Sequence, residues 1–327
     1  MKTYLVTGGL GFIGLNYILK GLENIDNFII NLDKKTYASN NINIKNKNYK
    51  FYKGDICSKT LVEKIFKTHK IDYVINFAAE SHVDRSFEDS EKFFKTNVLG
   101  VLNLLNICKK YWKNDLKNHR FIQISTDEVY GDSDEEKFED SSLSPNSPYA
   151  SSKASADLLV LSFIKSFSFP ALITRSTNNY GKYQYPEKLI PKIFIESSLN
   201  KKLPLYNKNH VRDWLYVEDN IKAINLVLNK GKIGEIYNIS AKNQKTNLGI
   251  CEKIIDYVKQ NINPSANKNL ITNEVNRLKD DKIYNINSDK IKSLGFTITD
   301  FETNFTSTLN FYKQNYNYLL NQYKCLK

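Results

Sequence analysis

Tyr149 and Lys153 have the residue types and the spacing of a general base and its activating cation. Ser147 and Pro148 stand directly before them, an order typical of the N-cap and first residue of a helix. Residues four apart lie on the same face of a helix. The ammonium is therefore expected to lower the pKa of the phenol, whose ordinary value is about 10. A phenolate placed in this way acts as a general base toward an alcohol.

Three polar residues, Thr126, Asp127 and Glu128, follow the apolar run FIQIS. We predict that this run is a strand with the three residues at its polar end. Two neighbouring carboxyls in different surroundings titrate at different pH values, so one can be an acid while the other is a base. A solvated pair of turn acids, or a helix N-cap, is the alternative interpretation.

The same Tyr and Lys spacing occurs once more, at Tyr49 and Lys53. This second pair lies in the run YKFYKGD, which is predicted to be a strand. Residues four apart in a strand are separated by roughly 13 Å. We therefore expect no joint action of Tyr49 and Lys53, and the pattern needs its structural context before it indicates a site.

The chain of 327 residues and 37.9 kDa is long enough for a main domain and a smaller lobe. Hydrophobic residues make up 41% and charged residues 25%, which is ordinary for a globular protein. No apolar run approaches the roughly 18 residues that a membrane span requires. The first residues, MKTYLVTGG, lead directly into a predicted strand without the pattern of a signal peptide. We expect a cytoplasmic protein.

The cysteines and the net charge suggest neither a metal site nor a nucleic-acid partner. The cysteines are far apart and are expected to be free thiols: Cys57, Cys108, Cys251 and Cys325. They form no metal-binding pattern with histidine. The net charge of +12 comes from lysines scattered along the chain, without a basic helix face or a recognised binding module. An anionic small molecule is a simpler reason for some of these cations.

A glycine-rich turn, Gly8 to Gly14, follows a predicted strand at residues 2–7 and opens a predicted helix. Such a turn brings backbone N–H groups and a helix N-terminus to a pyrophosphate. The next predicted strand, NFIINLD, ends in Asp33, where a carboxylate binds a ribose 2′-hydroxyl and repels a 2′-phosphate. The pattern favours NAD over NADP, although Lys34 and Lys35 weaken the preference. An ordinary tight turn is the alternative.

Strands and helices continue to alternate along the chain. Further strands are predicted at 49–55, 71–79 and 120–126, and helices near 59–69, 88–112, 217–229, 246–261 and 300–321. This order predicts an α/β fold, a Rossmann-type doubly wound parallel sheet. Ligands bind outside the carboxyl ends of such strands. We expect residues 1–175 to form the NAD-binding domain, with 213–240 returning to it, and 176–327 to form mainly a smaller, interleaved substrate-binding lobe.

Several segments resemble the extended short-chain dehydrogenase/reductase family and, within it, the dTDP-glucose 4,6-dehydratases. They are TGGLGFIG, LDKKTYASN, NFAAESHVDRS, TNVLG, ISTDEVYG, SPYASSK, RSTNNYGKYQYPEKLIP and VRDWLYVEDN. The resemblance runs from residue 1 to about 240 and more faintly to about 310. It implies a hydro-lyase that converts a nucleoside-diphosphate glucose to the 4-keto-6-deoxy sugar plus water, with NAD as cofactor. The pathway implied is deoxysugar biosynthesis, such as that of rhamnose, and a homodimer through helices near 98–112 and 148–166 is implied too.

The resemblance also implies residue roles. Tyr149, with Lys153, would act on the C4 hydroxyl, Glu128 on the C5 proton and Asp127 on the departing C6 hydroxyl, while Thr126 orients the sugar. Implied cofactor contacts are Gly8, Gly11, Phe12, Ile13, Gly14, Asp33, Lys34, Thr36, Asp55, Ile56, Phe77, Ala78, Ala79, Ser81, Thr96, Tyr149 and Lys153. Implied substrate contacts are Ser81, His82, Thr126, Asn178, Lys188, Leu189, Tyr206, Arg212, Asn247 and Arg277. Arg212 is the expected phosphate ligand, and an ion pair with Asp213 or Glu218 is its alternative role.

Two segments depart from the family pattern. The loop NKNHV, residues 207–211, is one residue shorter than usual, and LKDDKIY after Arg277 replaces Pro-Gly-His-Asp. Both are expected near the nucleotide base, so thymine and uracil both remain open. A UDP-sugar 4-epimerase or decarboxylase on the same scaffold is the alternative enzyme, and a non-catalytic NAD-binding regulator is the alternative outside catalysis.

Overall fold

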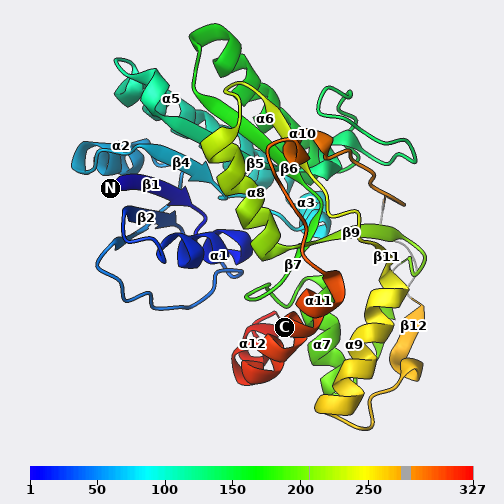
Figure 1. Cartoon of the computed structure of the whole chain (residues 1–327). Coiled ribbons are helices and arrows are strands. Elements are labelled where there is room, and N and C mark those ends of the chain that lie inside the picture. Colours follow the sequence, from blue (N-terminus) through cyan, green and yellow to red (C-terminus); the bar gives the residue numbers. More distant parts are fainter. Residues whose placement is uncertain (206, 274–280, 327) are drawn as a thin grey trace.

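The computed structural model describes residues 1–205, 207–273 and 281–326 (Figure 1). Its centre is a seven-stranded sheet in which every neighbouring pair of strands is parallel. In sheet order the strands are β10 (Ile236–Ile239), β6 (Ala171–Ser176), β5 (Arg120–Thr126), β4 (Tyr73–Asn76), β1 (Lys2–Thr7), β2 (Asn27–Asp33) and β3 (Tyr49–Lys53). The predicted doubly wound parallel sheet is confirmed.

Helices cover both faces of this sheet (Figure 1). One face packs against α2 (Lys59–Thr68), α5 (Gly100–Trp112) and α6 (Pro148–Phe167), and the other against α1 (Phe12–Gly21) and α8 (Val217–Lys230). Successive residues of β1 show why. Leu5 packs in the apolar core on the face of α2, α5 and α6, and Val6 packs in the core on the face of α1 and α8. Since side chains alternate along a strand, a sheet buried on both faces needs apolar residues at consecutive positions.

The segment between β4 and α5 differs from the single helix expected over 88–112. It consists of α3 (Val83–Glu88), α4 (Ser90–Phe94), a π-helical turn at Lys95–Leu99, and then α5. The side chain of Asn97 in this turn accepts from the backbone N–H of Glu80 and donates to the Glu80 carbonyl and to Ser152 Oγ. These buried hydrogen bonds tie the turn to the end of β4 and to α6, which accounts for the interruption of the regular helix.

The remaining elements form a smaller lobe beside the sheet (Figure 1). It contains a sheet of β11 (Gln244–Thr246), β9 (Val211–Tyr216) and β7 (Asn178–Tyr180), and a strand pair of β12 (Ile271–Asn273) and β8 (Leu203–Leu205). Its helices are α7 (Leu189–Ser198), α9 (Asn247–Asn261), α11 (Phe301–Gln314) and α12 (Tyr316–Lys324). The expected C-terminal helix over 300–321 is thus two helices that meet at Asn315.

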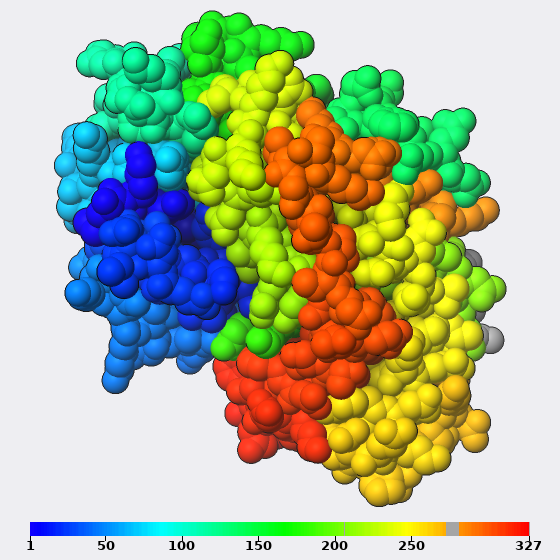
Figure 2. Space-filling model, viewed as in Figure 1, coloured from blue at the N-terminus to red at the C-terminus, as the bar shows by residue number. Residues whose placement is uncertain are grey.

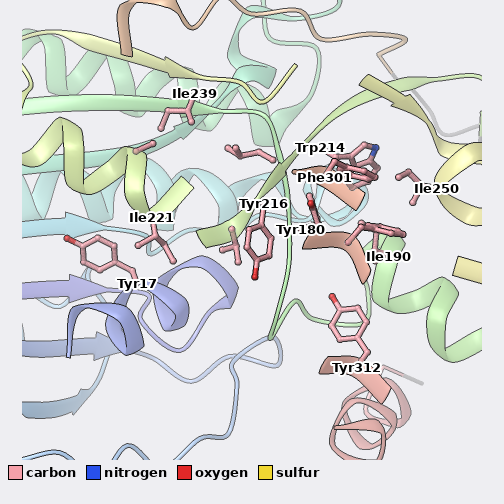
Figure 3. Packing of buried hydrophobic residues seen from close by; sticks show 14 of the residues in the cluster. Tyr17, Tyr180, Ile190, Trp214, Tyr216, Ile221, Ile239, Ile250, Phe301 and Tyr312 are labelled. Atoms are coloured by element: carbon pink, nitrogen blue, oxygen red, sulfur yellow. The ribbon is translucent and has the colours of Figure 1, made fainter. Parts of the chain in front are cut away.

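One apolar core joins the lobe to the sheet. Figure 3 shows Tyr180, Trp214, Phe301 and Tyr312 of the lobe in the same cluster as Tyr17 of α1 and neighbouring residues of α8. Figure 2 shows the orange segment before α11 lying along the yellow-green α8, where Thr299 donates from both its N–H and its Oγ1 to Asp219. The chain crosses repeatedly between sheet and lobe, so the two parts are packed as one body.

Short elements complete the described chain. They are α10 (Asp289–Lys292) and the 3₁₀ turns Leu116–Asn118, Asp127–Tyr130 and Lys268–Leu270. The four cysteines have free thiols, as expected. Within the described ranges, no helix is both long enough and apolar enough to cross a bilayer, and no cluster of three metal-ligating side chains occurs.

Candidate active site

The turn between β1 and α1 brings backbone close to backbone. Gly8 has φ of +67°, and a Cβ at that position would lie 2.6 Å from the backbone nitrogen of Ala78 at the end of β4. A Cβ on Gly14 would lie 2.5 Å from the Gly8 carbonyl oxygen. No side chain caps the N-terminus of α1. Its N–H groups are therefore available to an anion such as a pyrophosphate.

Asp33, at the end of β2, is held rigidly beside this turn. One carboxylate oxygen accepts from the Leu10 N–H at 3.0 Å and the other from the Lys35 N–H at 2.7 Å. The neighbouring Lys34 ammonium lies 3.2 Å from Glu80 and 3.6 Å from Asp55. Because two carboxylates share the charge of Lys34, it is poorly suited to attract a 2′-phosphate. The local charges therefore favour a ribose with a free 2′-hydroxyl.

A pocket of about 320 Å³ runs from the glycine turn along the carboxyl ends of the sheet strands. Every residue expected to contact the cofactor lines it: Gly8, Gly11, Phe12, Ile13, Gly14, Asp33, Lys34, Thr36, Asp55, Ile56, Phe77, Ala78, Ala79, Ser81, Thr96, Tyr149 and Lys153. Their contacts with a bound cofactor stay a prediction. The lining has the chemistry of a dinucleotide site, because it combines a backbone anion site at the glycine turn with the Asp33 carboxylate.

Asp127 and Glu128 differ sharply in their surroundings, although they are adjacent at the end of β5. Asp127 is 2% exposed, and its Oδ2 has no hydrogen-bond partner in the described structure. Burial raises the pKa of Asp127 well above its usual range, and the charges of Glu128 and Asp213 raise it further. Glu128 is only partly buried and lines the pocket. Asp127 is thus held as a neutral acid beside a more exposed carboxyl.

Thr126 links these carboxyls to the phenol. Its Oγ1 accepts from the Glu128 N–H at 3.3 Å and donates to Asp127 at 3.2 Å. The Thr126 side chain also lowers the pKa of Tyr149, against the effect of burial. Tyr149 is placed by the start of α6, where Ser147 is the N-cap and accepts from the Ala150 N–H at 3.1 Å, with Pro148 as the first helical residue. The predicted cap is confirmed.

The lowering of the phenol pKa by Lys153 stays a prediction, because other groups account for the pKa of Tyr149 in the protein alone. Burial raises the pKa of Tyr149, the Glu128 charge raises it further, and Lys153 is not among the causes of the shift. Lys153 is 4% exposed and donates to the Ile124 carbonyl at 2.5 Å. Burial lowers its pKa to about 8, against the opposing charge of Asp157. Removal of water disfavours the charged form of both groups, and burial is the largest cause of each pKa shift.

A second pocket of about 170 Å³ adjoins the first and contains most of the residues expected to bind substrate. Both pockets share Ser81, Glu128, Asn178, Glu187 and Lys188. The second also contains His82, Leu189 and Arg212, whereas Thr126 lines the first. Tyr206 and Arg277 lie outside the described residues. Asn247 lines neither pocket. It begins α9, and its side chain donates to the Asn207 carbonyl at 3.4 Å.

Arg212 projects from β9 into the second pocket and is 9% exposed. Its guanidinium donates to the Asp281 carbonyl at 2.8 Å and lies 5.1 Å from the ring centre of Tyr284. The two carboxylates proposed as alternative ion-pair partners have other ligands. Asp213 accepts from the Ser240 hydroxyl, and Glu218 accepts from Lys182 and Tyr216. Arg212 also donates to the carbonyls of Val211 and Lys282, and these bonds fix its guanidinium at the wall of the second pocket.

Sequence reasoning missed several residues that line the pockets. The first also contains Leu32, Ala38, Ser39, Gly54, Ile124, Ser125, Ser176, Thr177, Asn179, Gln184, Tyr185 and Glu187. The second also contains Val83, Asn146, Ser147, Asp281 and Tyr284. Ser125, Ser176 and Thr177 could have been found, because they lie at or next to the carboxyl ends of β5 and β6. Asp281 and Tyr284 belong to the segment LKDDKIY, which was expected near the nucleotide base, although neither residue was named as a contact.

The two segments that depart from the family pattern lie near the second pocket. The 207–211 loop packs on the start of α9, where the N–H groups of Asn247 and Leu248 donate to the carbonyls of His210 and Lys208. Of the altered segment, residues 278–280 lie outside the described residues. Asp281 accepts from Asn146 Nδ2 at 2.8 Å and from the Tyr284 hydroxyl at 2.6 Å. The effect of these two segments on the choice of nucleotide base stays a prediction.

Comparison with known proteins agrees with this architecture over nearly the whole chain. The family model for GDP-mannose 4,6 dehydratase matches residues 5–308. The dTDP-glucose 4,6-dehydratase of Salmonella typhimurium is 39% identical over 336 residues, covering 95% of this chain and 92% of that protein. The structure of dTDP-glucose 4,6-dehydratase from Bacillus anthracis with NAD has a TM-score of 0.88 at 39% identity and covers 98% of this chain and 100% of that chain.

A second solved structure is similar to the same extent. The dTDP-glucose 4,6-dehydratase of Streptomyces venezuelae, also with NAD bound, has a TM-score of 0.89 at 34% identity and covers 98% of this chain and 99% of that chain. The chain therefore shares its overall fold with both solved structures. This chain belongs to the GDP-mannose 4,6-dehydratase family.

Proposed function

We propose that the chain is an NAD-dependent nucleoside-diphosphate-glucose 4,6-dehydratase, a hydro-lyase of deoxysugar biosynthesis. The relatives and solved structures named above support this activity and this cofactor. One observation of the site carries the proposal. Asp127, which is buried and has a pKa raised well above its usual range, adjoins a partly buried Glu128 in the pocket that also contains Tyr149 and Lys153. An epimerase or a decarboxylase on this scaffold has no water to eliminate, and a non-catalytic regulator needs none of these groups.

The cofactor end of the pocket suits NAD. The chemistry that bound NAD supplies is the reversible acceptance of a hydride. The Gly8 turn and the uncapped N-terminus of α1 suit its pyrophosphate, and Asp33 suits the ribose hydroxyl. The pairing of Lys34 with Glu80 and Asp55 supports NAD over NADP.

Tyr149 removes the proton of the C4 hydroxyl when C4 is oxidised. In the protein alone, burial holds this side chain as a phenol. The positive charge of an oxidised nicotinamide at the same pocket favours the phenolate, as does the Lys153 ammonium when it is close. Lys153 donates to the Ile124 carbonyl, and the Thr126 side chain lowers the pKa of Tyr149 against burial.

The two carboxyls then divide the elimination between them. The C4 ketone acidifies the C5 proton, which the Glu128 carboxylate removes. Asp127 gives its proton to the departing C6 hydroxyl, so water leaves and a double bond forms between C5 and C6. Glu128 returns a proton to C5 when C6 is reduced. Burial of Asp127 serves this role directly, because a carboxyl kept neutral at working pH can donate.

The second pocket is the proposed site of the nucleoside diphosphate. Arg212 offers a guanidinium in the planar geometry that phosphate oxygens prefer. Ser81, His82, Asn178, Lys188 and Leu189 complete this end. Tyr206, Asn247 and Arg277 are proposed to act nearer the base. Relatives that act on dTDP-glucose support thymine, and UDP-glucose is the alternative.

Three coarser aspects of the protein are part of the same proposal. Residues 1–175 with 213–240 form the NAD-binding part, and most of 176–327 forms the substrate lobe. The chain acts as a cytoplasmic homodimer through α5 and α6. Exposed apolar side chains on and beside these helices support the dimer: Leu99 is 57%, Leu158 58% and Phe167 45% exposed. Pairing of the two helices with a second copy would cover them.

The test compares dTDP-glucose with UDP-glucose in kcat/KM, with the 4-keto-6-deoxy product detected by its absorbance in alkali. We expect turnover of dTDP-glucose, with a higher kcat/KM than that for UDP-glucose. Absence of this product from both substrates, in protein that binds NAD, would contradict the proposal.

A second test isolates the elimination. Glu128→Gln should still oxidise C4 but should lose incorporation of solvent deuterium at C5, because the amide cannot remove that proton. Glu136→Gln, which changes an acid that pairs with Lys242 outside both pockets, is the matched control. Unchanged deuterium incorporation in Glu128→Gln would count against its role as the C5 base.

A further inference from the structure

Three ionisable side chains are spaced four residues apart along α6: Tyr149, Lys153 and Asp157. The proposed function uses the first two. Asp157 is 0% exposed and has no part in that chemistry. A buried carboxylate is costly in free energy unless its surroundings use the charge. Its position two helical turns beyond Tyr149 places it on the side of α6 that faces β5.

Three consecutive residues of β5 contact these three side chains in turn. The Ile124 carbonyl accepts from Lys153 Nζ at 2.5 Å. Ser125 Oγ donates to Asp157 Oδ2 at 2.9 Å, and the Thr126 side chain lowers the pKa of Tyr149. The same strand that ends in the catalytic carboxyls therefore also fixes the row of groups on α6. A change at Asp157 is thereby coupled to the geometry of Lys153 and Tyr149.

The two oxygens of Asp157 are used differently. Oδ2 accepts from Ser125 and from Arg175 Nε at 2.9 Å, whereas Oδ1 has no hydrogen-bond partner in the described structure. Arg175 is itself held by the Tyr130 hydroxyl at 2.8 Å. Burial raises the pKa of Asp157, and the Arg175 charge opposes that rise. Arg175 thus favours the carboxylate form of Asp157.

The other elements around α6 bring few charges to Lys153. Asp127 and Glu128 follow β5, and Arg175 lies on β6. The α4 helix turns the neutral ring of Phe93 toward Tyr149, and the π-helical turn presents Asn97 to Ser152. Arg85 of α3 lies 3.7 Å from Glu187, and Lys109 of α5 lies over Phe167 at the far end of α6. Among these groups, Asp157 is the one whose charge raises the pKa of Lys153 against burial.

We propose that Asp157 is a positioning residue of the active site, whose buried carboxylate, one helical turn from Lys153 on α6, keeps Lys153 in the ammonium form. The inference rests on the proposed function, which gives Lys153 its role. A neutral lysine loses one N–H donor and the positive charge that favours a phenolate. The carboxylate of Asp157 therefore extends the pH range over which the base is active.

A direct test follows the Lys153 amine itself. The protein is labelled with ¹⁵N-lysine, and the Lys153 Nζ resonance is assigned by its absence from Lys153→Met. In Asp157→Asn we expect the titration midpoint of this resonance to fall by about one pH unit or more, since a close opposite charge shifts a pKa by that order. In Asp157→Glu, which keeps the charge, the midpoint should stay near the wild-type value. An unchanged midpoint in Asp157→Asn would overturn the proposal.

The second readout is the pH profile of kcat for the NAD-loaded enzyme with dTDP-glucose. In Asp157→Asn the ammonium is lost at a lower pH. The alkaline limb of the kcat profile should therefore shift to lower pH by the same number of pH units as the Nζ midpoint. A purely structural role would lower kcat by the same factor at every pH, and that result would contradict the inference. If the wild type shows no turnover, the proposed function fails, while the Nζ titration still decides the charge of Lys153.

A further variant guards against misfolding, because Asp157→Asn leaves the Arg175 cation buried without its partner. The double variant Asp157→Asn, Arg175→Gln removes both charges and leaves no unpaired buried ion. We expect the same lowered Nζ midpoint in this protein. A midpoint equal to that of the wild type would show that Asp157 does not hold the proton on Lys153.

Discussion

The chain contains the same two residues at the same spacing in two places, and the backbone decides what each pair can do. Tyr49 and Lys53 lie on β3, an edge strand of the main sheet. The Tyr49 hydroxyl accepts from Asn31 Nδ2 at 2.9 Å, and Lys53 is exposed. Tyr149 and Lys153 lie on α6 and line one pocket. Spacing indicates chemistry only when the period of the element brings both side chains to one place.

The two pairs also differ in what lies next to them. The helical pair adjoins β5, where the Thr126 side chain lowers the pKa of Tyr149 and the Ile124 carbonyl accepts from Lys153. The central position of β5, between β6 and β4, places its carboxyl end in the crevice where ligands of this fold bind. Lys53 on β3 is exposed to solvent, so the charge of its ammonium is screened by water.

The largest expected difference is between the two tyrosines. Tyr149→Phe should lower kcat by about 10²–10⁴-fold, because it removes the proposed base. Tyr49→Phe should leave kcat within about twofold, since its hydroxyl lies outside both pockets. Product formation from dTDP-glucose measures both. Near-normal turnover in Tyr149→Phe would remove the distinction between the pairs.

The two lysines give the next contrast. Lys153→Met should lower kcat by roughly 10²-fold through loss of the ammonium beside the base, whereas Lys53→Met should have no measurable effect. The wild-type rate should also fall as pH rises through the Lys153 pKa of about 8, because the ammonium is then lost. The profile of kcat, measured over roughly two pH units on either side of that pKa, checks this expectation. Equal losses in both variants would contradict the comparison.

A substitution at Asp127 tests whether the Tyr149 and Lys153 pair adjoins a buried acid with a raised pKa. Its pKa is raised by burial, so the folded state holds a proton that the unfolded chain releases above its ordinary pKa of 3.8. Where the folded state binds more protons, stability falls as pH rises. Asp127→Asn should therefore be more stable than the wild type at pH 7, although inactive, and the difference should disappear at low pH. Urea unfolding at the two pH values measures it, and equal stability throughout would argue against a buried neutral acid.

The smallest expected effects come from two N-cap serines. Ser147→Ala and Ser58→Ala each remove a cap hydrogen bond, from α6 and α2, and each should cost about 1 kcal/mol of unfolding free energy. Only Ser147→Ala should also lower kcat, by a few-fold, because α6 begins at the catalytic tyrosine. Unfolding and turnover assays on both variants separate the effects. A matching loss of kcat in Ser58→Ala would show that stability, not placement of Tyr149, is responsible.

The sequence by itself determined the alternation of strands and helices and two of the strands in full, whereas the strands predicted at 49–55 and 71–79 end earlier, at Lys53 and Asn76. The strands at 27–33 and 120–126 and the cap at Ser147 match the structure, because apolar runs and N-cap chemistry are local properties. The residues at those ends line the first pocket as expected. The Tyr149 and Lys153 pair could be separated from Tyr49 and Lys53 by period alone.

Only the tertiary structure decided the remaining features. The π-helical turn at Lys95–Leu99 depends on hydrogen bonds of Asn97 to Glu80 and Ser152, which are distant in sequence. Asp281 and Tyr284 reach the second pocket from a loop far from the catalytic helix along the chain. The pKa values of Asp127, Tyr149 and Lys153 are governed by burial, and burial is a property of the packed molecule. The sequence identifies the ionisable groups, whereas the exclusion of water in the folded protein shifts their pKa values.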